Sequence, residues 1–239
     1  MSTPVPVPEG TIAQRPLQFF WIADHSGSMA GLKIAKLNQA IREAVPEVKK
    51  AVAAHPEVAI MMRAIKFADG AAWHVGPNPA PVDKFVWPEL SPAGGTATSQ
   101  AIRLLASELT LEKMPRRGYP PVCILVSDGF CTDAPGQYDA AIADLLKLPW
   151  AMKAVRLAIA IGGESDYDEG ELLKFVSHRE IGVLKADTPE KLVAYIRWAS
   201  VAASVGASVG KSKAGASGPD TNNVGLPPAP LITSSTELF

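Results

Sequence analysis

Four apolar segments of strand length alternate with segments of helical periodicity, and this alternation constrains the fold more than any other feature of the chain. The apolar segments lie at 17–23, 58–67, 121–126 and 154–161. The first and third are almost continuously apolar, which indicates strands that are buried on both faces and run parallel to their neighbours. We therefore predict an α/β fold of three layers, in which a doubly wound, Rossmann-like and mostly parallel sheet carries helices on both faces.

Helical segments are expected between these strands. In residues 32–54 the apolar side chains recur every three or four positions, which predicts an amphipathic helix with one core-facing stripe. Pro46 lies inside this segment and is expected to kink or divide the helix, because proline lacks the backbone N–H of the helical ladder. Further helices are predicted over 100–109, 137–148, 171–177 and 189–203, and a further short strand over 181–184.

One antiparallel strand is expected at the edge of the sheet. Asp69-Gly70 follows the second apolar segment and is a two-residue hairpin signal, so residues 71–75 are predicted to return alongside it. His74 falls in this returning strand, where a structural role is favoured over a ligand role. The Pro-rich residues 76–92 are predicted to form a long connection, and connections of this length are often functional.

The composition divides the chain into three parts. Residues 1–15 form a Pro-rich leader, which is expected to be flexible and lacks the basic and apolar regions of a secretory signal. Residues 16–203 hold the predicted domain. Residues 204–239 are rich in Ser, Gly, Ala and Pro, so this tail is expected to be disordered or to dock on a partner. The hydroxyl groups at 233–236 are candidate kinase targets, although Ser/Thr-rich tails usually serve solubility.

The charge balance and the hydropathy argue against several classes of partner. With 23 basic and 24 acidic residues the net charge is −1, and no basic block points to nucleic acid. No apolar run approaches the roughly 18 residues that a membrane span needs, so no membrane association is expected. Cys123 and Cys131 lack the spacing of a metal site. Two reduced thiols are typical of a cytoplasmic protein, and this is the location we predict.

Oxygen-bearing side chains follow two of the doubly buried strands. Asp24, Ser26 and Ser28 come after the first strand, and Asp128 comes after the third. The carboxyl ends of parallel strands meet at one edge of an open α/β sheet, where ligands bind. A cluster made only of oxygens suits a hard cation such as Mg²⁺. The alternative is structural, with Asp24 or Ser26 capping the next helix and Asp128 in a plain turn.

Thr96 offers a further hydroxyl group from a second loop. It follows Gly94-Gly95, which give the backbone freedom just before a helix. One interpretation makes Thr96, or the nearby Thr98 or Ser99, the N-cap of that helix. The other makes Thr96 a third hydroxyl ligand of the same cation.

These motifs together resemble the metal-binding site of a known family. In chain order, the motifs Asp24-x-Ser26-x-Ser28, Gly94-Gly95-Thr96 and Ser127-Asp128-Gly129 are similar to the metal-ion-dependent adhesion site (MIDAS) of von Willebrand factor A domains. The resemblance spans residues 16–200 and implies the von Willebrand factor A fold. It also implies a bound Mg²⁺, with Mn²⁺ or Ca²⁺ as alternatives, and a protein partner that supplies an Asp or Glu carboxylate to the cation.

The resemblance also implies a role for each residue of the site. Ser26 and Ser28 would bind the cation directly, and Thr96 directly or through water. Asp24 and Asp128 would contact it mainly through water while accepting hydrogen bonds from the hydroxyl ligands. Few direct anionic ligands leave the cation electron-poor, so its open position favours a carboxylate from the partner.

A narrower resemblance is carried by residues 20–24, 63–67 and 158–162 and by the last helix with Trp198. These stretches look like the bacterial TerY-like proteins of tellurium-resistance-type clusters. Proteins of this kind are associated with protein kinase and PP2C-type phosphatase partners and with stress or metal resistance. The resemblance therefore implies a regulatory or scaffolding component of such a system.

No familiar catalytic motif accompanies these residues. The sequence has neither a Gly-x-Ser-x-Gly nucleophile motif nor a phosphate-binding Gly-x-x-x-x-Gly-Lys-Ser/Thr loop. His25 is expected to face away from the ligands, and His178 lies near a helix end. We therefore expect a binding module and not an enzyme. Two alternatives stay open: an Mg²⁺-dependent hydrolase or phosphatase that uses a metal-activated water, and a metal-free structural scaffold in which the same residues are caps.

Overall fold

A six-stranded sheet forms the centre of the protein. The computed structural model describes residues 13–53, 55–128, 130–163, 165–209 and 224–232. The strands lie in the order β3-β2-β1-β4-β5-β6, and every neighbouring pair is parallel except β2 and β3. Their bounds are β1 Arg15–Asp24, β2 Val58–Phe67, β3 Ala71–Pro81, β4 Val122–Ser127, β5 Val155–Ile161 and β6 Leu184–Ala186. The predicted sheet, mostly parallel with one antiparallel edge strand, is confirmed.

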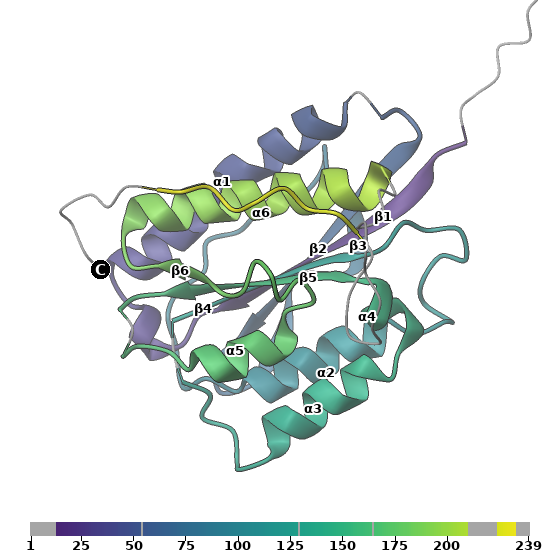
Figure 1. Cartoon of the computed structure of the whole chain (residues 1–239). Coiled ribbons are helices and arrows are strands. Elements are labelled where there is room, and N and C mark those ends of the chain that lie inside the picture. Colours follow the sequence, from purple (N-terminus) through teal and green to yellow (C-terminus); the bar gives the residue numbers. More distant parts are fainter. Residues whose placement is uncertain (1–12, 54, 129, 164, 210–223, 233–239) are drawn as a thin grey trace, which may run out of the picture.

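Helices cover both faces of the sheet, so the protein has three layers (Figure 1). Helices α1 (Leu32–Val52) and α6 (Pro189–Val209) lie on one face. The other face carries α2 (Thr98–Glu108), α3 (Gln137–Leu146) and α5 (Glu169–Phe175), together with the short α4 (Pro149–Lys153). The predicted α/β class with helices on both faces is therefore confirmed.

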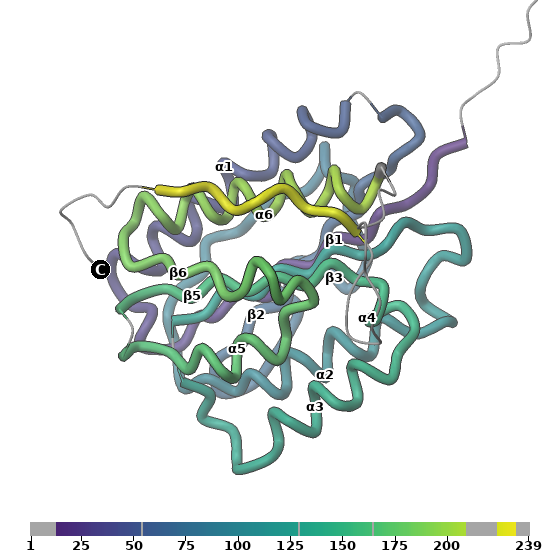
Figure 2. Tube along the Cα trace, viewed as in Figure 1, coloured from purple at the N-terminus to yellow at the C-terminus, as the bar shows by residue number. Residues whose placement is uncertain are grey.

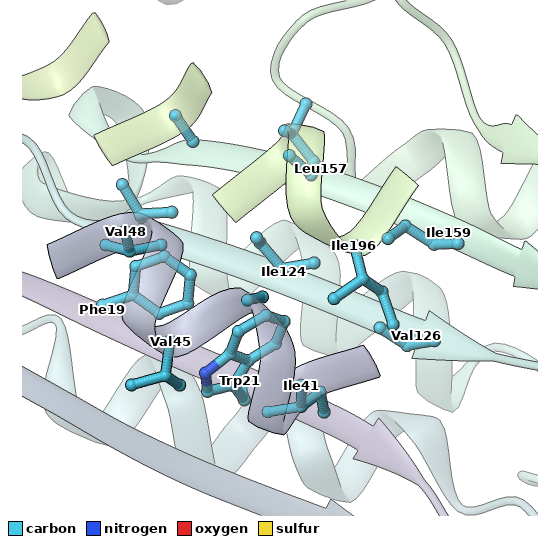
Figure 3. Close-up of a cluster of buried hydrophobic side chains, with 14 of the residues drawn as sticks. Phe19, Trp21, Ile41, Val45, Val48, Ile124, Val126, Leu157, Ile159 and Ile196 are labelled. Atoms are coloured by element: carbon cyan, nitrogen blue, oxygen red, sulfur yellow. The ribbon is translucent and has the colours of Figure 1, made fainter. Parts of the chain in front are cut away.

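The side chains of β1 show why both faces of the sheet are covered. Phe19 and Trp21 belong to the core under α1 and α6, whereas Phe20 and Ile22 belong to the core under α2 and α3. All four are fully buried. Figure 3 shows the first of these cores, with Phe19 and Trp21 beside Val45 of α1. A strand that buries both faces has to lie in the middle of a sheet, and β1 accordingly pairs with both β2 and β4.

Helix α1 is continuous although Pro46 lies inside it. The expected alternative of a division at Pro46 is wrong. Val45 and Val48, on either side of the proline, are buried in the core above the sheet, and this packing holds both halves of the helix on one face. Burial of the whole apolar stripe outweighs the roughly 3 kcal/mol that an internal proline costs a helix.

Strand β3 is longer than predicted and takes up part of the expected 76–92 connection. The strand continues to Pro81, and the Val82 N–H then donates to the Ile60 carbonyl at 3.0 Å. Residues 77–79 lie where the register between β2 and β3 shifts, so their prolines are not needed as donors to β2. Edge strands and bulges are the places in a sheet that accept proline.

Several boundaries in the C-terminal half differ from the predicted ones. Helix α5 begins at Glu169, earlier than expected, because the Asp168 side chain caps it by accepting a hydrogen bond from the Glu171 N–H at 3.0 Å. Strand β6 forms at 184–186 and not at 181–184. Helix α4 is a separate turn beyond α3, since Pro149 can start a helix but not continue one.

The chain after the last helix packs back onto the domain. Helix α6 continues to Val209, so the predicted domain boundary at residue 203 falls inside this helix. Residues 224–232, which we call the C-terminal strap, run along α6 (Figure 2). Val224 at the start of the strap is buried, and its carbonyl oxygen lies 2.8 Å from Nε2 of His178. This part of the predicted tail is therefore docked on the protein itself.

Some predictions fall on residues outside the described part of the chain. These are residues 1–12 of the leader, Gly129 of the third motif, and residues 210–223 and 233–239 of the tail, which include the candidate kinase targets. In the part of the chain that the structure describes, no helix is long and apolar enough to cross a membrane. Cys123 and Cys131 are both free thiols, as the sequence predicts.

Candidate metal centre

The carboxyl ends of β1 and β4 lie side by side at the centre of the sheet. Asp24 is the last residue of β1, and Asp128 directly follows Ser127, the last residue of β4. The chain leaves β1 toward β2 on one side and later crosses to β4 on the other. The strand order therefore reverses between β1 and β4, and this is the position at which open α/β sheets bind ligands.

A chain of hydrogen bonds joins four of the five predicted site residues. The Ser26 N–H donates to Asp24 Oδ1 at 2.8 Å, and the hydroxyl oxygens of Ser26 and Ser28 lie 3.0 Å apart. The Ser28 hydroxyl donates to Asp128 Oδ1 at 2.7 Å. The fold thus brings together oxygens that lie about 100 residues apart along the chain.

The alternative that Asp24 and Ser26 are helix caps is not supported. Ser26 precedes a short 3-10 helix, η1 (Gly27–Met29), without a side-chain capping hydrogen bond. Helix α1 begins after Gly31, again without a side-chain cap. Both side chains therefore point their oxygens into the hydrogen-bond chain described above.

Asp24 is a fully buried carboxylate, and its hydrogen-bond donors in the part of the chain that the structure describes are neutral. Its second oxygen, Oδ2, accepts a hydrogen bond from the Ser127 hydroxyl at 2.6 Å. The pKa of Asp24 is raised from 3.8 to about 6, mainly because burial disfavours the charged form and in small part because the Asp128 carboxylate is near, while the hydrogen bonds from Ser127 and Ser26 act in the opposite direction. The charge of this carboxylate is only partly offset by its own surroundings.

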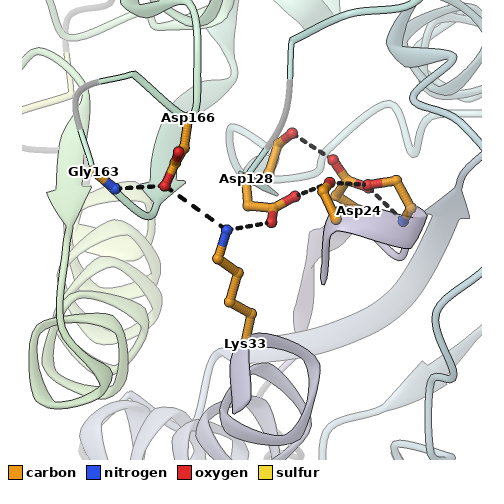
Figure 4. Close-up of polar contacts among 8 residues, drawn as sticks. Asp24, Lys33, Asp128, Gly163 and Asp166 are labelled. Atoms are coloured by element: carbon orange, nitrogen blue, oxygen red, sulfur yellow. Dashed lines mark hydrogen bonds and ion pairs between the residues drawn. The ribbon is translucent and has the colours of Figure 1, made fainter. Parts of the chain in front are cut away.

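Asp128 has a charged partner that the sequence motifs did not reveal. Lys33, in the first turn of α1, places Nζ 2.7 Å from Asp128 Oδ2. The same Nζ lies 3.9 Å from Oδ2 of Asp166, which in turn accepts a hydrogen bond from the Gly163 N–H at 2.8 Å (Figure 4). One ammonium group therefore stands between a fully buried carboxylate and a half-exposed one.

The loop that carries Thr96 is held against the loop after β1. The Gly27 N–H donates to the Gly94 carbonyl at 2.9 Å, and the Ala93 N–H donates to the His25 carbonyl at 2.7 Å. Thr96 itself is buried. Among the hydrogen bonds of the described residues, none links the Thr96 hydroxyl to the other four site residues, so its role as a ligand stays a prediction.

Interactions of the Thr96 loop also rule out the interpretation as a helix cap. Helix α2 starts at Thr98 without a side-chain cap from Ala97, the residue at its N-cap position. The backbone N–H of Ser99, in the first turn of α2, instead donates to Oδ2 of Asp133 at 2.6 Å, and Asp133 lies on another loop. In the same way the Thr96 N–H donates to the Thr132 hydroxyl at 2.9 Å.

Gly94 has a backbone conformation and surroundings that only glycine fits. Its φ is +62°, in the left-handed region, and a Cβ atom would lie 2.2 Å from Oδ2 of Asp69. Asp69 also accepts a hydrogen bond from the Gly95 N–H at 2.6 Å. This aspartate, predicted only as a hairpin residue, therefore buttresses the Thr96 loop.

The oxygen set fits a hard divalent cation. The hydroxyl oxygens of Ser26 and Ser28 lie 3.0 Å apart, and neighbouring ligands of an octahedral Mg²⁺ lie about 3.0 Å apart for bonds of about 2.1 Å. Within the described residues, no group of three or more His, Cys, Asp or Glu side chains could hold a metal ion. A cation at this position would therefore depend on the serine hydroxyls.

The histidines have structural partners outside the oxygen cluster. His25 Nδ1 lies 3.0 Å from the Ser91 carbonyl oxygen, so the ring faces away from the ligands, as expected. His74 Nε2 lies 3.0 Å from the Pro88 carbonyl oxygen. His178 is buried with the strap. Its Nδ1 lies 2.9 Å from the Ser177 hydroxyl.

Sequence reasoning missed the residues that act on the site from elsewhere, namely Lys33, Asp69, Ser127 and Asp166. A lysine in the first turn of a helix is ordinary, and nothing in its spacing says which carboxylate it will reach. Ser127 carried a signal, since it adjoins Asp128 at the end of a buried strand.

No family model and no curated protein matches the sequence. Several solved structures are similar in fold. A von Willebrand factor type A protein from Catenulispora acidiphila aligns with a TM-score of 0.59 and 18% identity over 81% of this chain and 43% of that one. Proximal thread matrix protein 1 from the mussel byssus, with a zinc-occupied MIDAS motif, aligns with a TM-score of 0.57 and 20% identity over 81% and 46%.

A third similar structure is the ArnB paralog VWA2 from Sulfolobus acidocaldarius, with a TM-score of 0.56 and 16% identity over 77% of this chain and 45% of that one. This chain spans less than half of the length of each of these three proteins. The protein thus has the von Willebrand factor A fold, with its oxygen cluster at the switch point of the sheet.

Proposed function

We propose that the protein is a metal-dependent protein-interaction module, in which a divalent cation binds the oxygen cluster and a partner protein supplies an Asp or Glu to it. One observation carries the proposal. A chain of hydrogen bonds through a backbone N–H and two hydroxyls runs from one buried carboxylate to another at the switch point of the sheet, and the donors to Asp24 among the described residues are neutral.

Each residue has a defined task in this proposal. Ser26 and Ser28 hold the cation through their hydroxyl oxygens, and Thr96 adds a third hydroxyl, directly or through water. Asp128 accepts the hydrogen of Ser28, so Ser26 is the donor between the two hydroxyls and one lone pair of the Ser28 oxygen is left for the cation. Asp24 positions the loop through the Ser26 N–H. The bound cation supplies a positive centre with an open position, which attracts a carboxylate.

Mg²⁺ is the cation that we propose, with Mn²⁺ or Ca²⁺ as alternatives. Hydroxyl and carboxylate oxygens suit these hard ions, whereas zinc sites in proteins are usually built with nitrogen or sulfur ligands. The zinc-occupied MIDAS motif of the byssus protein supports a divalent cation at such a motif in this fold. It does not select the metal for this chain.

We propose binding without catalysis. A hydrolytic role for Ser26 needs a base within hydrogen-bond reach. His25 and His178 lie against other groups, a backbone carbonyl for the first and Ser177 and the strap for the second. Turnover of a generic phosphoester in the presence of Mg²⁺ would contradict this part of the proposal and favour a metal-activated water.

The cellular setting is proposed from the narrower resemblance. Residues 20–24 and 63–67, which carry it, pair with each other in β1 and β2. On this basis the module is a cytoplasmic regulatory or scaffolding component of a TerY-like stress or tellurium-resistance-type system. Its partners there are a protein kinase and a PP2C-type phosphatase.

The test is calorimetric titration of Mg²⁺, Mn²⁺ and Ca²⁺ into the wild type and into Ser26→Ala/Ser28→Ala. We expect the double variant to lose roughly 100-fold or more in affinity, since it removes two hydroxyl ligands. Ser107→Ala, at an exposed position of α2, is the matched control and should bind like the wild type. Equal binding by the double variant would contradict the proposed ligands.

A pull-down identifies the partner: the protein is immobilised, and lysate proteins that bind to it with Mg²⁺ or with EDTA are compared. Proteins held only by the wild type and only with Mg²⁺ are the expected partners, and a kinase or phosphatase among them would support the cellular setting. The same proteins retained with EDTA and by the double variant would favour the metal-free scaffold.

A further inference from the structure

We propose that Lys33 is an internal counter-ion of Asp128, which a divalent cation displaces on binding, and that Asp166 then receives the lysine ammonium group. This inference rests on the proposed function, because it requires a cation at the oxygen cluster. In this inference, Lys33 of α1 and Asp166 of the loop after β5 regulate the affinity of the cluster for the metal ion.

Lys33 and the ligand chain share one carboxylate. Asp128 Oδ1 accepts the Ser28 hydroxyl at 2.7 Å, while Oδ2 lies 2.7 Å from Lys33 Nζ. The Asp128 side chain is fully buried and that of Lys33 is 18% exposed. A buried carboxylate without a cation is costly, so the ammonium group balances the charge of Asp128 whenever no metal ion is bound.

A divalent cation and this ammonium group compete for Asp128. A cation on Ser28 uses the same carboxylate, and two positive charges within a few ångströms repel each other strongly in a buried site. The lysine is the group that can yield, because it ends a flexible four-carbon stem, whereas the serines are fixed on a short loop after β1.

Asp166 is a prepared second partner for the lysine. Its Oδ2 lies 3.9 Å from Lys33 Nζ and is held by the Gly163 N–H at 2.8 Å. The preceding Gly162 has φ +113°, and a Cβ there would lie 2.4 Å from the same oxygen. The backbone at Gly162 and Gly163 therefore leaves room for this carboxylate, which is 43% exposed. A small side-chain rotation of Lys33 would bring its ammonium group to Asp166 (Figure 4).

The exchange predicts that removing the lysine charge improves metal binding. Lys33→Met keeps the stem and removes the ammonium group, so we expect the calorimetric affinity for Mg²⁺ to rise by about tenfold. In EDTA the same variant should melt at a lower temperature than the wild type, because Asp128 is left without a cation. Saturating Mg²⁺ should close this difference. Lys36→Met, one turn along α1, is the control and should change neither value.

Asp166→Asn tests the second half of the exchange, since asparagine keeps the oxygen that accepts the Gly163 N–H. In the wild-type background it should weaken Mg²⁺ binding about threefold, because the displaced lysine loses its partner. In the Lys33→Met background it should have no effect. An equal effect in both backgrounds would overturn the role of Asp166 as the receiver.

The outcomes separate this inference from the proposed function. If the wild type binds Mg²⁺ and Lys33→Met binds it with the same affinity, the exchange is overturned and the metal site stands. If Mg²⁺ binds to Lys33→Met but not measurably to the wild type, the counter-ion role is supported in its strongest form. If neither protein binds a divalent cation, the proposed function and the exchange are both overturned.

Discussion

Two buried clusters in this protein differ in the groups that surround their carboxylate. In the metal centre, Asp24 receives hydrogen bonds from a backbone N–H and from the Ser127 hydroxyl. In a second cluster, Glu108 at the end of α2 lies 2.6 Å from Arg63 of β2 and 2.7 Å from Lys113. Arg63 also donates to Gln18 of β1 at 3.2 Å. We call these four residues the Arg63 cluster: Arg63, Glu108, Lys113 and Gln18.

The pKa values of Asp24 and Glu108 are shifted in opposite directions because their hydrogen-bond partners differ in charge. Burial alone would raise the pKa of Glu108, but the hydrogen bonds and charges of Lys113 and Arg63 lower it below its usual value. Burial raises the pKa of Asp24 to about 6, because its neutral donors do not offset the loss of water. Glu108, which is paired with two cations of its own fold, serves structure. An acid with only neutral donors still has negative charge available to a cation from outside.

The largest effect is expected from removal of the acid of the Arg63 cluster. Glu108→Ala leaves a buried guanidinium group without its carboxylate, so we expect the free energy of unfolding to fall by about 3 kcal/mol or more. Mg²⁺ affinity should not change. Urea denaturation and calorimetry measure the two quantities. Glu112→Ala, at an exposed position nearby, is the control. A loss below about 1 kcal/mol would mean that this ion pair contributes little.

The pH dependence of stability should distinguish Asp24 from Glu108, since the two acids change the stability with opposite sign. Folded Asp24 binds its proton more tightly than the unfolded chain does, so its contribution to stability falls as the pH rises from about 4 to about 6. The ionised form should cost the metal-free protein about 2–3 kcal/mol at pH 7. Glu108, with a lowered pKa, instead stabilises the fold above its usual value of 4.5, and that contribution is lost toward lower pH.

Asp24→Asn isolates the first of these contributions. In EDTA it should be more stable than the wild type at pH 7 and of similar stability near pH 4, by urea denaturation. Its Mg²⁺ affinity should fall, because the negative charge is gone. Identical pH profiles of the variant and the wild type would show that Asp24 does not cause the pH dependence of the free energy of unfolding.

The smallest effect is expected at His25, which lies between two site residues in sequence but outside the site in space. His25→Ala removes one hydrogen bond to the Ser91 carbonyl, so stability should fall by about 1 kcal/mol. Calorimetric Mg²⁺ affinity should stay within about threefold of the wild type. A tenfold loss would place the imidazole in the metal centre after all.

Much of the fold could be predicted because its information is local. Strands such as β1 and β4 are apolar on both faces, and a helix like α1 repeats its apolar residues every three or four positions. These patterns report burial directly. The predictions were wrong where packing against other elements determines the structure. Pro46 stays inside α1 because the sheet below it holds both halves of the helix, and prolines enter β3 because it is an edge strand.

The candidate site divides in the same way. The sequence by itself determined which residue types stand after the central strands, so that Asp24, Ser26, Ser28 and Asp128 could be named before their arrangement was known. The contact of Lys33 with Asp128, 95 residues away, and the hydrogen bond from Ser127 to Asp24 arise only when the chain is folded. The physical reason is that a strand end fixes the position of its own oxygens, whereas the charge balance around them depends on side chains that only packing brings near.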